Sequence, residues 1–135
     1  MLLIPLEGWY DIGLIALRLA IGIIFFYHGM QKLRNVHATA DGLHWRPWRV
    51  VFLGLAELFV SITSILGFLT EIAGIVLAVI MLGALYYKIV VWKIPFSAHD
   101  KIGWEFDLLI LAAALALLLV GAGNFSIDSW MKWWP

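Results

Sequence analysis

The stretch of sequence that decides the fold is residues 50–92, VVFLGLAELFVSITSILGFLTEIAGIVLAVIMLGALYYKIVVW. It contains two apolar runs, 50–69 and 71–92, with a very short connection around Gly67. A helix that spans a bilayer needs about 20 mainly apolar residues, so each run is long enough. Because so little chain separates the two runs, we predict an antiparallel pair of membrane-spanning helices.

Two further runs, 12–33 and 103–122, have the same apolar character. The composition agrees: 64% of the 135 residues are hydrophobic and only 13% are charged, whereas soluble proteins have roughly 25% charged residues. We therefore predict an all-α fold, an integral membrane four-helix bundle. We treat residues 1–135 as a single membrane domain.

The composition also excludes several classes of function. The chain has no cysteine, which rules out dithiol redox chemistry, disulfides, iron–sulfur clusters and covalent haem attachment through Cys. Its formal net charge is +0, so no nucleic-acid partner is expected. The N-terminus lacks a basic segment, and we expect no cleavable signal peptide. We also expect no metal site, because His37 and His44 lack a compact ligand spacing.

The basic residues predict an orientation in a cell membrane. Loops 34–49 and 93–102, with the helix ends beside them, hold seven of them: Lys32, Arg34, Arg46, Arg49, Lys88, Lys93 and Lys101. Outside the spans, the opposite side has only Lys132. Because cytoplasmic loops carry an excess of Lys and Arg, we predict a multi-pass protein with both termini outside and both loops cytoplasmic.

Arg18 and Glu57 are charged residues in the interior of apolar runs. An ion in hydrocarbon costs at least ~2.5–3.5 kcal/mol on insertion scales, so both side chains should face the inside of the bundle. Arg18 begins a stripe at heptad-like spacing that continues with Gly22, Phe25, Gly29 and Lys32. Glu57 lies in a stripe of small or polar residues that also contains Gly54, Ser61 and Ser64. We predict that Arg18 and Glu57 form a buried ion pair or share a small polar pocket, which either fixes the register of the helices or binds a quinone, an anion or protons.

A second polar group lies toward the predicted cytoplasmic side. Its members are His28, Gln31, Lys32, Lys88, Glu105 and Asp107, with His99 and Asp100 nearby. We predict that His28, Glu57 and Glu105 line one cleft and bind a ligand there. The alternative stays open that Lys32 only reaches the interface, Glu105 only complements the helix dipole, and His28 only packs.

Six short motifs, in their order and spacing, resemble the DoxX family of small membrane proteins. They are RLAIG (18–22), YHGMQKL (27–33), GLAE (54–57), GFLT (67–70), GWEFDLL (103–109) and GAGNFSID (121–128). The resemblance covers nearly the whole chain. It implies that Arg18, His28, Lys32, Glu57, Glu105 and Asp128 are the positions that match a shared site.

The resemblance also implies a function, because relatives include a subunit of thiosulfate:quinone oxidoreductase and a subunit linked to a terminal quinol oxidase. We expect a small subunit of a membrane oxidoreductase complex that contacts quinone, holds no covalent cofactor and is not catalytic alone. Its expected partners are lipid and a larger membrane complex or further copies of itself. Two alternatives stay open: a structural or assembly subunit, and an oligomeric transporter of a small solute or protons.

Overall fold

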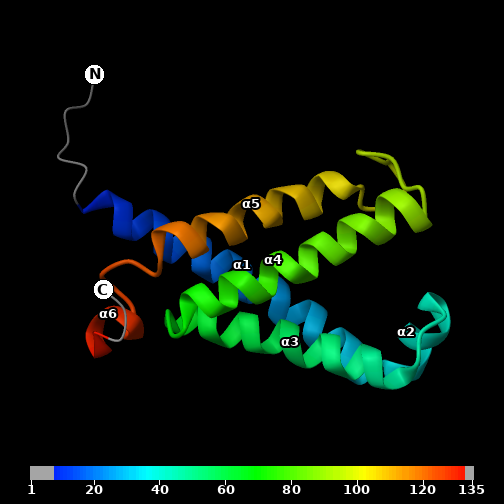
Figure 1. Cartoon of the computed structure of the whole chain (residues 1–135), viewed down its shortest axis with the longest axis horizontal. Coiled ribbons are helices and arrows are strands. Elements are labelled where there is room, and N and C mark those ends of the chain that lie inside the picture. The colour runs from blue at the N-terminus through cyan, green and yellow to red at the C-terminus, as the bar shows by residue number, and fades with distance from the viewer. Residues whose placement is uncertain (1–7, 133–135) are drawn as a thin grey trace.

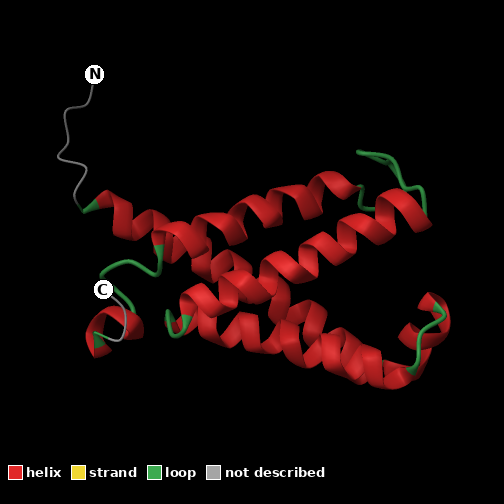
Figure 2. Cartoon of the chain, viewed as in Figure 1, coloured by secondary structure: helices red, strands yellow, loops and turns green. Residues whose placement is uncertain are grey.

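The computed structural model describes residues 8–132, and every regular element among them is a helix (Figure 2). The elements are α1 (Trp9–Arg34), α2 (Val36–Leu43), α3 (Pro47–Leu66), α4 (Thr70–Tyr86), the π-helix η1 (Tyr87–Val91), α5 (Trp104–Val120) and α6 (Ile127–Met131). The prediction of an all-α membrane fold is confirmed. The first connection was expected to be a loop, but it contains the two-turn helix α2.

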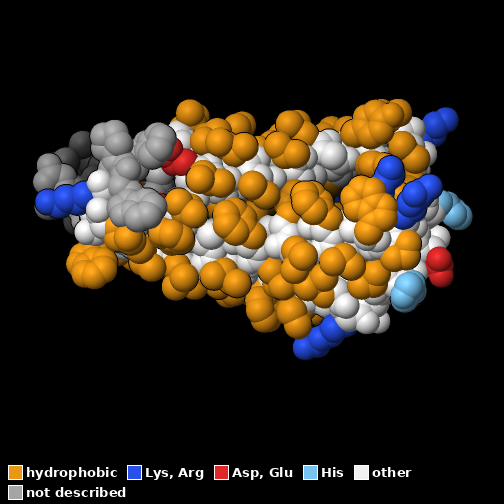
Figure 3. Space-filling model, turned by 60° about the horizontal axis from the view of Figure 1, so that its bottom comes forward, with side chains coloured by type: hydrophobic (Ala, Val, Ile, Leu, Met, Phe, Trp, Pro, Cys, Tyr) orange, Lys and Arg blue, Asp and Glu red, His pale blue; other side chains and the backbone are white. Residues whose placement is uncertain are grey.

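Within residues 8–132, three helices are long and apolar enough to cross a membrane: α1, α3, and α4 with its continuation into η1. They correspond to the predicted runs 12–33, 50–69 and 71–92. The fourth run, 103–122, forms α5, which has 17 residues and stays a prediction as a span. Large apolar side chains on the outer faces of all these helices are exposed, and Figure 3 shows them covering the middle of the molecule.

The helices form two pairs, α1 with α3 and α4 with α5. Figure 1 shows the pairs meeting at the end that holds the turn between α3 and α4, and separating toward the end that holds α2. Proline begins α3 at Pro47, where its missing N–H is not needed. Gly67 ends α3 in the left-handed conformation, with φ at 63°. This sharp stop lets α4 begin three residues later.

The register of α1 on α3 is set by close backbone contact. Ser61 donates a hydrogen bond to the carbonyl oxygen of Gly22 at 2.7 Å. A Cβ atom on Gly29 would lie 2.9 Å from the carbonyl oxygen of Gly54, so only glycine fits there. Small residues at such contacts let helices approach closely in lipid. The faces predicted for these two helices are confirmed as buried, except that Lys32 is partly exposed.

The C-terminal segment 121–131 is tied to the end where the helix pairs meet. Asp128 accepts hydrogen bonds from the backbone N–H groups of Leu69 (2.8 Å) and Thr70 (2.9 Å) at the start of α4, where a carboxylate is favourable. Asp11 of α1 accepts from the backbone and side-chain nitrogens of Asn124 at 2.8 and 2.9 Å. The segment therefore joins the first helix to the turn between α3 and α4.

Arg18 completes this junction. Its guanidinium donates hydrogen bonds to the carbonyl oxygens of Ala122 (2.8 Å) and Phe125 (2.9 Å). A Cβ atom on Gly67 would clash with the Arg18 guanidinium, so the glycine at this turn leaves room for the arginine. Arg18 and Asp128 are thus structural residues that hold the C-terminal segment in place.

We predict that Gly29→Ala lowers the free energy of unfolding by about 1–3 kcal/mol, because the added methyl group meets backbone that cannot move aside. Thermal unfolding of the detergent-solubilised protein, followed by circular dichroism, measures this loss. The matched control is Gly13→Ala in the same helix, where a Cβ atom meets nothing within 4 Å. That variant should be unchanged or slightly more stable. Equal losses in the two variants would contradict the close α1–α3 contact.

Candidate functional site

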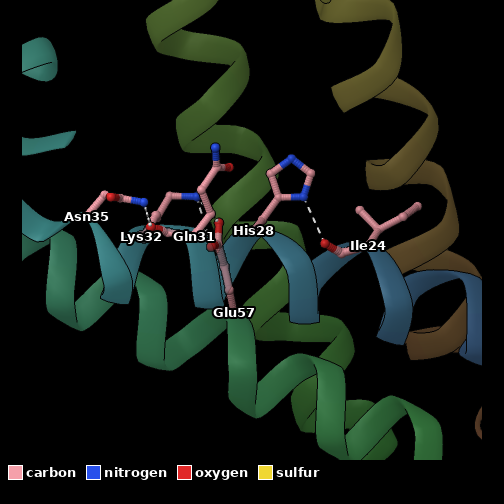
Figure 4. Close-up of polar contacts among 6 residues, drawn as sticks. All are labelled: Ile24, His28, Gln31, Lys32, Asn35 and Glu57. Carbon is pink, nitrogen blue, oxygen red and sulfur yellow. Dashed lines mark hydrogen bonds and ion pairs between the residues drawn. The ribbon is translucent and has the colours of Figure 1, made fainter. Parts of the chain in front are cut away.

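Lys32 and Glu57 form an ion pair between α1 and α3. The Lys32 Nζ atom lies 2.9 Å from both carboxylate oxygens of Glu57 (Figure 4). The Glu57 side chain is 5% exposed and the Lys32 side chain 18%, so the carboxylate is the more deeply buried partner. The pair leaves neither carboxylate oxygen without a donor in a largely apolar environment, where an unpaired charge is costly.

The predicted pairing of Arg18 with Glu57 is wrong, and the helix register explains why. The contacts of Gly22 with Ser61 and of Gly29 with Gly54 place Glu57 opposite position 26 of α1. Arg18 is then about 12 Å away along the helix axis. Side chains also tilt toward the N-terminus of their own helix, which takes Arg18 farther from Glu57 and brings Lys32 toward it.

His28 lies one turn before Lys32 on α1 and is half-buried. Its Nδ1 atom is 2.8 Å from the carbonyl oxygen of Ile24. A carbonyl oxygen can only accept a hydrogen bond, so Nδ1 carries a hydrogen and donates. Figure 4 shows the ring standing away from α1, with the other nitrogen at the outer edge of the ring. The ring is therefore held in one orientation by its own helix.

A second ion pair faces the site from the other helix pair. The Lys88 Nζ atom of η1 lies 2.5 Å from the Asp107 Oδ2 atom of α5. Lys88 belongs to a π-helix, a distortion that is often found at functional sites. Each helix pair therefore contributes one lysine and one carboxylate, with the lysine near the C-terminal end of its first helix.

The structure does not bring Glu105 into the site, which corrects that part of the prediction. Glu105 is exposed, whereas Asp107 is buried. Residues two positions apart in an α-helix point about 200° apart around its axis. Of Glu105 and Asp107, one must therefore face outward when the other faces inward. The inward face of α5 consists of Asp107, Ile110, Ala114 and Leu117. The sequence offered both carboxylates in the first turn, and the expected face was the wrong one.

A cavity of about 910 Å³ lies between the two helix pairs, at the end where they separate. His28 and both ion pairs line it, and Arg18 and Glu105 do not. The other walls are mainly apolar and aromatic, with side chains from α1, α2, α3, α4, η1 and α5. The basic and histidine side chains on the face that Figure 3 shows gather mostly at this same end of the molecule. Within residues 8–132, no group of three or more His, Asp or Glu residues could hold a metal ion.

Aromatic rings connect the two helix pairs beside this cavity. The Trp45 ring, just after α2, lies 5.3 Å from the Tyr87 ring of η1 in an edge-to-face contact. The Trp92 ring lies 5.5 Å from the same tyrosine. All three residues line the cavity. This contact between distant segments was not expected from the sequence, because an aromatic pair leaves no spacing signal between residues so far apart.

Comparisons with known proteins identify a family and one relative. The model of the family described as DoxX matches residues 13–92, which contain His28, Lys32, Glu57 and Lys88 but not Asp107. A protein of Bacillus subtilis (strain 168) described as "Putative oxidoreductase CatD" is 29% identical over 122 residues. That alignment covers 88% of this chain and 87% of the relative. No solved structure matches the chain significantly.

We predict strong coupling between Lys32 and Glu57. Lys32→Met or Glu57→Leu alone should each cost about 3–5 kcal/mol of stability, because one buried charge loses its partner. The double variant should cost clearly less than the sum, as measured by unfolding in detergent and denaturant. The control is Arg18→Met combined with Glu57→Leu, whose effects should add because the residues are not in contact. Coupling of Glu57 to Arg18 rather than to Lys32 would contradict the structure.

Proposed function

The chain belongs to the DoxX family, and we propose that it is a small subunit of a membrane oxidoreductase complex that holds a quinone-type ligand in the cavity between its helix pairs. The name of the Bacillus subtilis relative supports an oxidoreductase role. The observation that carries the proposal is the cavity itself. It combines apolar walls with a few convergent polar groups, which is typical of sites for small organic ligands.

The chemistry of the cavity suits a quinone head group. Aromatic and aliphatic side chains surround a flat ring well, and the volume of about 910 Å³ leaves room for part of an apolar tail. The cavity lies within the apolar helices, where a lipid-soluble ligand is found. His28 and the two ion pairs place polar groups within reach of the ring oxygens. The charges of each pair balance, so a neutral ligand meets no net charge.

The subunit would act together with a redox partner. The chain has no cysteine, so it cannot pass electrons through thiols as dithiol proteins do. A bound quinone must receive or give two electrons, and we propose that a partner protein in the same membrane exchanges them. The chain itself would bind and position the ligand. Further copies of this chain or a larger complex would surround the exposed apolar faces together with lipid.

A second candidate function is a structural or assembly subunit without a ligand. One observation favours it: Arg18, Asp11 and Asp128 are all used in holding the C-terminal segment. The Lys32–Glu57 pair is likewise satisfied within the chain. In this case the charges fix the register of the helices and nothing more. The two candidates differ in whether the cavity is occupied in the membrane.

We predict that quinone co-purifies with the protein in mild detergent and that Ala84→Phe removes most of it. Ala84 lines the cavity, so a phenyl ring there takes the place of the ligand. Organic extraction followed by chromatography measures bound quinone per protein. The matched control is Ala112→Phe, at an exposed position of α5 outside the cavity, which should keep its quinone. Absence of quinone from the wild-type protein, or equal amounts in both variants, would favour the structural subunit.

We also propose that both termini lie outside the cytoplasm and that loops 34–49 and 93–102 lie inside it. The basic residues of these two loops support this orientation. Figure 1 supports the pairing of the loops, since α2 and the connection between η1 and α5 lie at one end and α6 lies at the other.

Reporter fusions test this orientation. Alkaline phosphatase fused after the last residue should be active, because it folds only outside the cytoplasm. A fluorescent protein that folds only in the cytoplasm should be bright when it is inserted at Pro95 in the second loop. The two positions act as controls for each other. The opposite pattern, with an inactive phosphatase at the C-terminus of a stable full-length fusion, would reverse the assignment.

A further inference from the structure

The second ring nitrogen of His28 is an unused hydrogen-bond acceptor in the cavity. Because Nδ1 donates to the carbonyl oxygen of Ile24, the neutral ring has its lone pair on Nε2. No group among residues 8–132 makes a hydrogen bond with this nitrogen. The bond to Ile24 therefore decides which kind of partner Nε2 can take, namely one that donates.

The charged groups of the cavity already pair with one another. Both oxygens of Glu57 accept from Lys32 at 2.9 Å, and Asp107 is held by Lys88. Each carboxylate of the cavity thus already faces a lysine of the same helix pair. Among the residues that line the cavity within 8–132, His28 is the one histidine. Its Nε2 atom is the ring nitrogen that makes no hydrogen bond with its own helix. At this position the protein can accept a hydrogen bond from a ligand that carries a donor group.

The surroundings of His28 fit a ring. The Phe25 ring centroid lies 6.2 Å from that of His28, and both residues line the cavity. Phe106 and Ile110 of α5 also line it. Aromatic side chains favour offset or edge-to-face contact with another ring at such separations. A flat aromatic ligand that carries a hydroxyl group meets both the apolar walls and the acceptor.

We propose that His28 selects the redox state of the ligand, so that the cavity binds a hydroquinone more tightly than the corresponding quinone. A hydroquinone hydroxyl can donate to Nε2, whereas a quinone carbonyl oxygen can only accept. This inference rests on the proposed function, since it assigns the reduced form of the same ligand to the same cavity. It makes His28 a specificity-determining residue.

Binding of three matched probes to the full-length protein in detergent tests the proposal. The probes are a short-chain benzoquinone, its hydroquinone under anaerobic conditions, and the dimethyl ether of that hydroquinone. The ether keeps the ring and loses both donors. One hydrogen bond of ordinary net strength corresponds to about two- to tenfold in affinity. We expect the hydroquinone to bind more tightly than both other probes by a factor in this range.

Variants locate the effect at the histidine. His28→Phe keeps a flat ring and removes the acceptor, so the preference for hydroquinone over quinone should fall to about one. The matched control is His37→Phe on α2, an exposed histidine outside the cavity, which should keep the preference. Nitrogen-15 NMR of histidine-labelled protein checks the ring directly and should show the Nδ1–H form for His28. The probe series on the wild-type protein stands even where a variant fails to fold.

Each outcome decides a separate point. Equal affinity for hydroquinone and quinone in the wild-type protein overturns the inference and leaves the proposed function standing. A preference for quinone also overturns it, since that requires Nε2 to donate. Retention of the hydroquinone preference in His28→Phe assigns the selection to another group and likewise overturns it. Failure of all three probes to bind contradicts the proposed function itself.

Discussion

The structure depends on the high free energy of an unpaired charge in hydrocarbon, which is at least ~2.5–3.5 kcal/mol per ion. Four buried ionic side chains lie in α1, α3 and α5: Asp11, Arg18, Glu57 and Asp107. Each has a partner in another element. Arg18 binds carbonyl oxygens of the C-terminal segment, and Glu57 binds Lys32. The need for partners therefore determines which segments come together.

These partnerships divide the molecule into two ends with different character. At the end where the helix pairs meet, Asp11, Arg18 and Asp128 bind mainly backbone groups, which makes a fixed junction. At the other end, each ion pair stays within one helix pair, so no charge draws the two pairs together there. The pairs separate and a cavity remains between them. The same constraint thus produces a closed end and an open end.

The sequence was sufficient for the four long helices and for most of the buried faces of α1 and α3, because glycine, serine and charge in apolar runs are strong signals. It did not predict the short helices α2 and α6. It was not sufficient for the partner of Glu57. That choice depends on how far α1 is shifted along its axis relative to α3. The shift is set by backbone contacts at Gly22 and Gly29, which cannot be read from the sequence alone. The choice between Glu105 and Asp107 failed for a similar reason, since the rotation of α5 is set by its packing on α4. The orientation of His28 required the bond to Ile24.

The binding of Arg18 by Ala122 and Phe125 has a consequence for biosynthesis. A ribosome makes the chain from the N-terminus, so α1 enters the membrane long before residues 122–125 exist. Until they emerge, the guanidinium of Arg18 lacks the carbonyl oxygens that it binds in the finished protein. Assembly of the helices therefore cannot be completed one helix at a time in the order of synthesis. A chain that stops before residue 122 therefore leaves the guanidinium of Arg18 in α1 without both of these acceptors.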